Sequence, residues 1–177
     1  GSWVLPAGLL ELADAAALGT NTSNLTLSGG TLSGRANTST TFTGPAANLL
    51  LTADTSILSD RPSNGSGLTH TFGTLSMGTQ SLTVAPGGNP TSGTAEVVLG
   101  DLTITGNPHL DVNDNGSVIG RLTTGSILGG GIARTITKTG TGDLAVTGGT
   151  SDLPVGSTIT ATGGGTVEMR FASFGSG

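Results

Sequence analysis

The segment Asp111-Val-Asn-Asp-Asn-Gly116 carries the densest group of possible metal-binding oxygens in the chain. Its alternating oxygen side chains and its glycine match the first half of a calcium-binding loop. Such a loop ends on a bidentate carboxylate at its twelfth position, which in this chain is Leu122. Because the second half fails, the sequence favours a solvated turn, in which Asn and Asp bond their own backbone, over a calcium site.

Side chains that could act as a general acid and base are sparse. Asp111 and Asp114 share one turn with His109 nearby, and they form the best acid and base cluster on offer. Glu96 and Asp101 are the nearest other pair, but their spacing puts them on opposite faces of a straight strand. The sequence therefore predicts a protein that is not an enzyme and assigns no catalytic residue.

The remaining residues of chemical interest are isolated in the sequence. His70 and His109 stand far apart and the chain has no cysteine, so each histidine is expected at the surface or a corner and not in a zinc site. The single lysine, Lys138, is expected to be an ordinary exposed charge and not one partner of an isopeptide bond. The sequence assigns no metal ligand and no cofactor-binding residue.

Three Thr-Ile-Thr triplets, at 103–105, 135–137 and 158–160, could present a regular array of hydroxyl and methyl groups. Such an array on a flat face is used by β-helical ice-binding proteins, so ice binding is a lesser alternative function. Threonine is also simply favoured on the outward side of strands, and that interpretation is preferred.

The composition limits the kind of protein that can position these residues. The 177 residues include 32 glycines, with 10% charged and 3% aromatic residues and a net charge of −5. Basic residues are few and scattered, which argues against nucleic acid as a partner. The longest apolar stretch, residues 3–18, contains Glu11 and Asp14 and is too short and too charged to span a bilayer, so no membrane insertion is expected. Gly1-Ser2 is interpreted as an expression scar.

Short patches with a two-residue period predict strands of three to five residues, each with one buried face. They are Leu25–Leu27, Leu49–Leu51, Leu75–Met77, Leu82–Val84, Val97–Leu99, Leu102–Ile104, Leu110–Val112, Leu144–Val146 and Val167–Met169. Glycine-rich and Asn-rich turns separate them, and residues 13–18 are expected to form a loop or one helical turn. With so few aromatic anchors, stacked coils are favoured over a sandwich.

One segment points to a known family. Ile136-Thr-Lys-Thr-Gly-Thr-Gly-Asp-Leu-Ala-Val146 resembles the signature of the autotransporter-associated β-strand repeat, also called the passenger-associated transport repeat, and Gly165–Met169 resembles its second half. Gly8–Leu12 and Gly29–Leu32 resemble the segment that usually follows. The resemblance implies an all-β chain folded as a right-handed parallel β-solenoid, or β-helix, in a secreted passenger.

The expected function is that of a non-enzymatic, stiff spacer or stalk in a bacterial fibre, located outside the cell or on its surface. Residues 1–177 are expected to form one solenoid segment, one period of a longer array, because Gly8–Leu12 and Gly165–Met169 carry similar sequences. Its expected partners are neighbouring repeats that stack end to end. The alternative is an adhesin that contacts glycan or another cell through loops 54–71 and 85–94, the least regular stretches.

Overall fold

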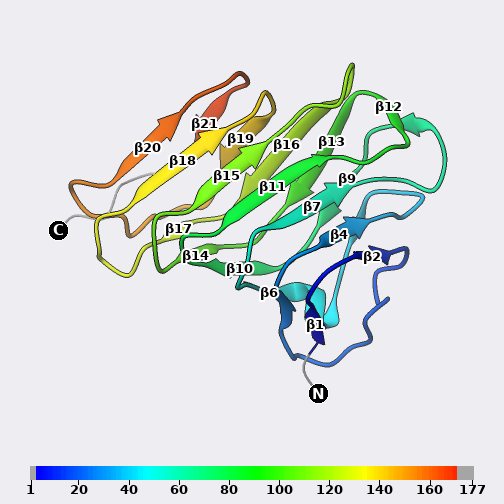
Figure 1. Ribbon diagram of the computed structural model, residues 1–177, viewed down its shortest axis with the longest axis horizontal. Coiled ribbons are helices and arrows are strands. Elements are labelled where there is room, and N and C mark those ends of the chain that lie inside the picture. The colour runs from blue at the N-terminus through cyan, green and yellow to red at the C-terminus, as the bar shows by residue number, and fades with distance from the viewer. Residues whose placement is uncertain (1–2, 171–177) are drawn as a thin grey trace.

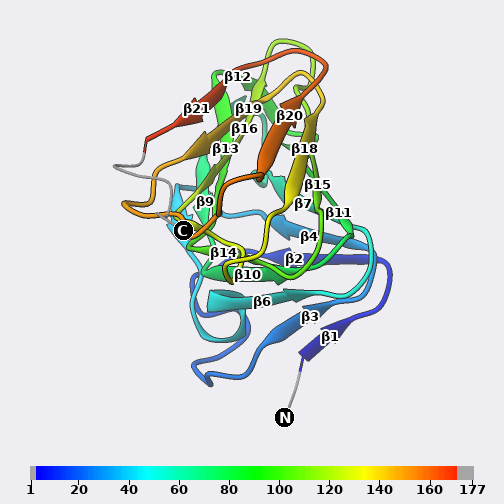
Figure 2. The same ribbon diagram turned by 90° about the vertical axis from the view of Figure 1, so that its left-hand side faces the viewer.

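The computed structural model describes residues 3–170, and these form a parallel β-solenoid with no α-helix (Figure 1). The chain winds through three sheets in turn and repeats this circuit in stacked coils, so the predicted fold class is confirmed. β1 and β2 lie at one end of the stack and β20 and β21 at the other (Figures 1 and 2). Gly1-Ser2, the expected scar, lies outside the described residues.

Each inner coil contributes one strand to each main sheet, whereas the first coil has no strand in sheet C and the last described coil has none in sheet A. Every pairing between these strands is parallel. Sheet A contains β1 (Trp3–Leu5), β3 (Leu25–Leu27), β6 (Asn48–Leu51), β10 (Thr74–Met77), β14 (Leu102–Ile104) and β17 (Ile127–Leu128). Sheet B contains β2 (Leu9–Leu12), β4 (Thr31–Gly34), β7 (Thr55–Ser59), β11 (Ser81–Pro86), β15 (His109–Val112), β18 (Thr135–Thr139) and β20 (Thr158–Ala161). Sheet C contains β5 (Thr40–Thr41), β9 (Thr69–Thr71), β13 (Thr94–Val98), β16 (Ile119–Thr124), β19 (Asp143–Val146) and β21 (Val167–Met169).

The core consists of side chains that stack from coil to coil. One ladder in sheet A runs through residues in direct register, namely Leu25, Leu49, Leu75, Leu102 and Ile127. All five are buried. Alternation inside each short strand turns every second residue inward, and the parallel register then places like residues above one another. The two-residue period of the sequence is therefore what builds the core.

Some corners between sheets use backbone that only glycine adopts easily. Gly30 has φ +73° at the corner before β4, and a β-carbon there would come 2.5 Å from the carbonyl oxygen of Gly8 in the preceding coil. A side chain at this corner would therefore force adjacent coils apart. Residues 13–18 form a turned loop, as predicted, with Ala17 N–H donating to the Asp14 carbonyl. A 3₁₀ turn named η1 (Gly44–Ala47) is the one helical element among residues 3–170, and the sequence does not predict it.

A lateral excursion leaves the stack at the corner between sheets B and C. It is formed by residues 60–68 and 87–93, which pair through β8 (Gly65–Ser66) and β12 (Pro90–Ser92) into a separate two-stranded sheet. We call these residues the flap, and Figure 1 shows β12 at the side of the stack. The predicted loops 54–71 and 85–94 extend too far at both ends. The ends of these two ranges belong to the core strands β7, β9, β11 and β13.

The expected equivalence of the two ends of the chain is wrong. Gly8–Leu12 contributes β2 to sheet B, whereas Gly165–Met169 contributes β21 to sheet C. The sequence also matches Leu18-Gly19 with Phe174-Gly175, and the last two of these residues lie outside the described ones. Similar Gly-x-x-Glu-x strings thus arise on different sides of a coil, because a glycine turn followed by an alternating strand occurs before both β2 and β21.

Candidate functional site

A charged column crosses the outer face of sheet C at the end of the stack that contains β20 and β21. In register, Glu96 of β13 stands beside Arg121 of β16, and Arg121 stands beside Asp143 of β19. Glu168 of β21 lies one column away, next to Ala145. Arg121 pairs with Glu96 at 3.5 Å and with Glu168 at 3.3 Å. The guanidinium group of Arg121 thus links its own coil to the preceding coil, which carries Glu96, and to the last coil, which carries Glu168.

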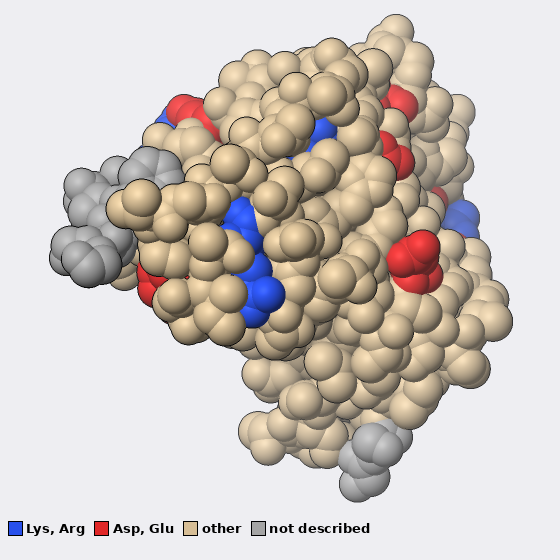
Figure 3. Space-filling model, turned by 60° about the vertical axis from the view of Figure 1, so that its left-hand side comes forward, with Lys and Arg blue, Asp and Glu red and all other residues tan. Residues whose placement is uncertain are grey.

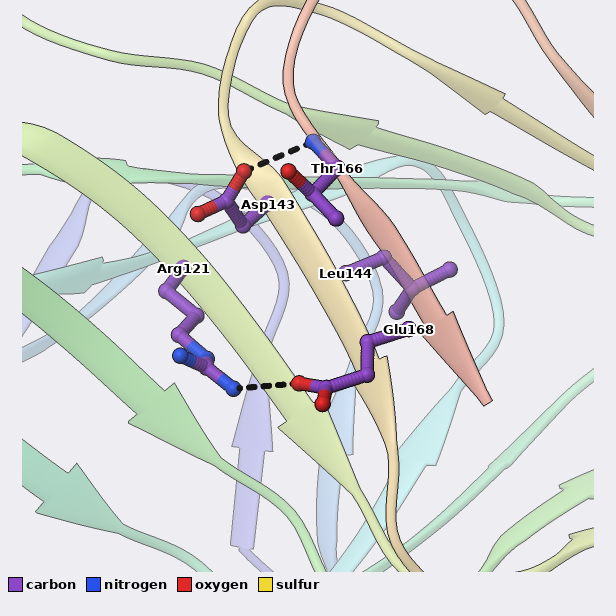
Figure 4. A pocket seen from close by; sticks show the side chains of 5 residues that line it. All are labelled: Arg121, Asp143, Leu144, Thr166 and Glu168. Atoms are coloured by element: carbon purple, nitrogen blue, oxygen red, sulfur yellow. Dashed lines mark hydrogen bonds and ion pairs between the residues drawn. The ribbon is translucent and has the colours of Figure 1, made fainter. Parts of the chain in front are cut away.

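This column borders a cavity of about 270 Å³ that is lined by Arg121, Asp143, Leu144, Thr166 and Glu168 (Figure 4). Asp143 accepts a hydrogen bond from the Thr166 N–H at 2.7 Å, and Glu168 also pairs with Arg170 at 2.6 Å. The carboxylates therefore hold coils together through cations and backbone N–H groups. Arg121 stands between Glu96 and Asp143 in the register, so a positive charge separates these two carboxylates along the column.

The sequence did not reveal this column. Its members lie 25 and 22 residues apart, at Glu96, Arg121 and Asp143, and coil lengths vary along the chain. Glu96 and Asp101, the nearest pair of carboxylates in the sequence analysis, do not come together in the structure. Glu96 bonds Thr123 across sheet C, whereas Asp101 accepts the Ser126 N–H at the corner before sheet A.

The predicted calcium loop forms the corner between β15 and β16. Asn115 and Val118 close it with two backbone hydrogen bonds, and Gly116 takes φ +60°. The Asp114 carboxylate accepts the Gly120 N–H at 2.9 Å, and Asn115 donates to the Gly87 carbonyl of the flap. The loop is therefore a bonded turn that packs beside the flap. In residues 3–170, no three Asp, Glu or His side chains gather closely enough to hold a metal ion.

His109 and Asp111 of the predicted acid and base cluster do come together, on the outer face of sheet B. Both side chains point to the same side of β15. The hydroxyl of Thr139 in the next coil bridges them, at 2.7 Å from Nε2 of His109 and 2.7 Å from Oδ1 of Asp111. Asp114 does not join them, since its carboxylate is bonded at the neighbouring corner. The outward position of His109 agrees with the predicted surface location.

His70 was expected at the surface or a corner, and this prediction is wrong. It points into the core from β9, is fully buried, and stacks on Phe42 with ring centroids 5.7 Å apart. Its Nδ1 lies 2.9 Å from the hydroxyl of Ser59, and that hydroxyl donates its hydrogen to the Leu68 carbonyl. Nδ1 must therefore carry the imidazole hydrogen. Burial lowers the pKa of His70 to about 4, against the attraction of Asp60.

Lys138 was expected to be exposed, and this prediction is also wrong. It lies inward on β18, in register with Leu110, and is fully buried. Its Nζ donates to the carbonyls of Gly140 at 2.9 Å and Gly164 at 2.8 Å, so it links the last two coils. Burial lowers the pKa of the amine, and nearby carboxylates, chiefly that of Asp143, act in the opposite direction.

The three Thr-Ile-Thr triplets do not share one face. Thr135 and Thr137 lie in register with Thr158 and Thr160 on sheet B, whereas Thr103 lies on sheet A. The column of Thr137 continues into His109 in the preceding coil, which interrupts the hydroxyl array.

Comparison with family models, with curated proteins and with solved structures gives no match. The resemblance of residues 136–146 to the autotransporter-associated repeat therefore stays a prediction. Within residues 3–170, no helix has the length and apolar character needed to cross a membrane.

Proposed function

We propose that this chain is a non-enzymatic structural segment that acts as a stiff spacer. The observation that supports this proposal best is the continuous parallel register through all three main sheets. Each coil adds about 4.8 Å along the stack, the spacing of hydrogen-bonded strands. Stability then comes from contacts between neighbouring coils, so such a rod needs no cofactor.

The surface is consistent with a spacer. On the face in Figure 3, charged side chains are few and scattered among uncharged residues. Charged groups on sheet C pair with one another between coils, as Arg121 does with Glu96 and Glu168. A fibre stalk outside a bacterial cell is the setting that the repeat resemblance implies, and we keep it as part of the proposal.

Neighbouring coils of the same kind are the proposed partners. Among the described strands, β2 and β20 have no partner on the outer edge of sheet B. The first coil also exposes apolar side chains, with Trp3 at 42%, Val4 at 55% and Leu9 at 59% exposure. Open edges and apolar surface of this kind favour the addition of a further coil.

An adhesin is the second candidate, and the flap is the observation that favours it. The flap gathers the two irregular stretches into one projecting unit, held by the bond from the Asn89 side chain to the Arg61 carbonyl and by the β8 and β12 pairing. Asn64, Thr91 and Ser92 expose polar side chains there, which could bond sugar hydroxyl groups.

A glycan array separates the two candidates. The spacer proposal predicts that the fluorescently labelled chain binds no glycan above background. Saturable binding that is lost in Asn64→Ala/Thr91→Ala, and kept in the matched variant Thr103→Ala on sheet A, would replace the spacer by the adhesin. The variants disturb only exposed side chains, so circular dichroism should be unchanged in both.

A further inference from the structure

A continuous hydrogen-bonded chain of four side chains crosses the outer face of sheet B. The hydroxyl oxygen of Ser81 on β11 lies 3.2 Å from Nδ1 of His109 on β15. His109 Nε2 lies 2.7 Å from the hydroxyl of Thr139 on β18, and that hydroxyl lies 2.7 Å from Asp111 Oδ1. The four residues come from three successive coils, and each is half-buried.

The position of every hydrogen in this series of hydrogen bonds follows from the carboxylate of Asp111. A carboxylate only accepts, so the Thr139 hydroxyl donates to Asp111. Its oxygen can then only accept from His109, so Nε2 of the neutral ring carries the hydrogen. Nδ1 is left with its lone pair, and the hydrogen bond from the Ser81 hydroxyl must run toward it. The serine proton is thus aimed at a base that is itself oriented by a carboxylate.

The surroundings fix both ends of the chain. Asp111 keeps its orientation because its second oxygen accepts from the Asn113 side chain at 2.8 Å. Ser81 is held by its backbone N–H, which donates to Asp54 at 2.8 Å. Other hydroxyl pairs on the solenoid, such as Thr158 with Thr135, link two side chains and stop there. The four-residue chain differs because it joins a nucleophile, a base and an orienting acid.

From this geometry we propose that Ser81 is an activated nucleophile that accepts an acyl group from an activated ester, which makes it a covalent attachment point on the rod. The Ser81 oxygen bonds to the ester carbonyl carbon, and its proton passes to His109 Nδ1. The bond from that carbon to the leaving oxygen then breaks, and the leaving group takes the proton from His109. His109 acts as the base, while Thr139 and Asp111 are positioning residues.

Labelling with a biotin-tagged fluorophosphonate tests this directly. The Ser81 oxygen displaces fluoride from phosphorus, a P–O bond replaces the P–F bond, and the proton goes to His109. We expect stoichiometric label at Ser81 by peptide mass mapping, with none at Ser76, a half-buried serine on sheet A. His109→Gln should slow labelling by about 100-fold, the lower range for removal of a general base.

The positioning residues have a matched pair of variants. Thr139→Val keeps the shape but removes the hydroxyl, and should slow labelling by about tenfold or more. Thr139→Ser keeps the hydroxyl and should restore the rate, which a purely structural role of the Thr139 methyl group would not do. Unfolding midpoints in urea, measured on the same samples, show that each variant is folded. Equal labelling of Ser76 and Ser81, or an unchanged rate in His109→Gln or Thr139→Val, would overturn the proposal.

Discussion

Replacing Leu102 by alanine is expected to lower the free energy of unfolding by about 2–5 kcal/mol, the usual range for truncating a buried leucine. Leu102 lies inward on β14, in register with Leu75 on one side and Ile127 on the other, and is fully buried. The cavity left behind would interrupt a ladder that both neighbouring coils share. Urea unfolding followed by circular dichroism measures the effect.

The matched control is the next residue on the same strand. Thr103 points outward and is exposed, so Thr103→Ala should change stability by no more than about 0.5 kcal/mol, as is usual at the surface. Equal losses in the two variants would mean that the inward and outward faces of β14 are assigned incorrectly.

Acidification is expected to cost about 3 kcal/mol of stability through His70 alone. Its pKa in the folded chain is about 4, compared with 6.5 for a free histidine. Between these values the unfolded chain binds the proton and the folded chain does not. The contribution of His70 to the free energy of unfolding is therefore fully present above pH 6.5 and is lost as the pH falls toward 4. Each unit of difference between the pKa of the folded and the unfolded chain corresponds to about 1.4 kcal/mol of stability.

Urea unfolding at pH 7 and at pH 4 measures this loss in the wild type and in His70→Leu. The leucine cannot titrate, so the variant should lose about 3 kcal/mol less than the wild type between the two pH values. Thr103→Ala changes an exposed side chain that does not titrate and should keep the wild-type loss. If His70→Leu and the wild type lose the same amount, His70 is not the group responsible.

The sequence was sufficient to predict the fold class because solenoid strands follow a local rule. All nine segments with a two-residue period lie in or at the strands of the stack, from Leu25–Leu27 to Val167–Met169. β8 and β12 were not found, because Gly65, Ser66 and Ser92 carry no apolar alternation. Their pairing depends on two loops that meet only after the coils have stacked.

The burial of Lys138 follows from a signal in the sequence. In the segment from Thr135 to Thr139, the two-residue period puts Lys138 on the same face as Ile136, and that face is buried. Residue type suggested exposure, but the strand period and two carbonyl acceptors decided the position. For His70 the same signal is present, because a two-residue period puts it on the same face as Phe72, and both side chains are buried.

The charged column and the Ser81 chain depend on register between coils, which the sequence could not fix. Coil length varies, as the steps from Leu49 to Leu75 to Leu102 to Ile127 show. An error of one residue in register turns every side chain of a strand to the opposite face. Arg121 could therefore not be matched with Glu96 or Asp143, nor Thr139 with His109, before the stacking was known.

The most direct test of a stiff, stacked rod is the distance between spin labels along one outward column of sheet A. The chain has no cysteine, so labels can be placed uniquely at Val4→Cys with Thr103→Cys or with Leu128→Cys. These positions are separated by four and five register steps, so backbone distances of about 19 and 24 Å are expected from a strand spacing of about 4.8 Å.

Pulsed electron paramagnetic resonance should therefore give two narrow distance distributions, whose centres differ by about one strand spacing, about 4.8 Å. Narrow distributions would establish that the column is stiff, and their offset would establish that one coil adds one strand spacing. Broad distributions would contradict the stiffness, and centres that do not differ would contradict the stacking of one coil on the next.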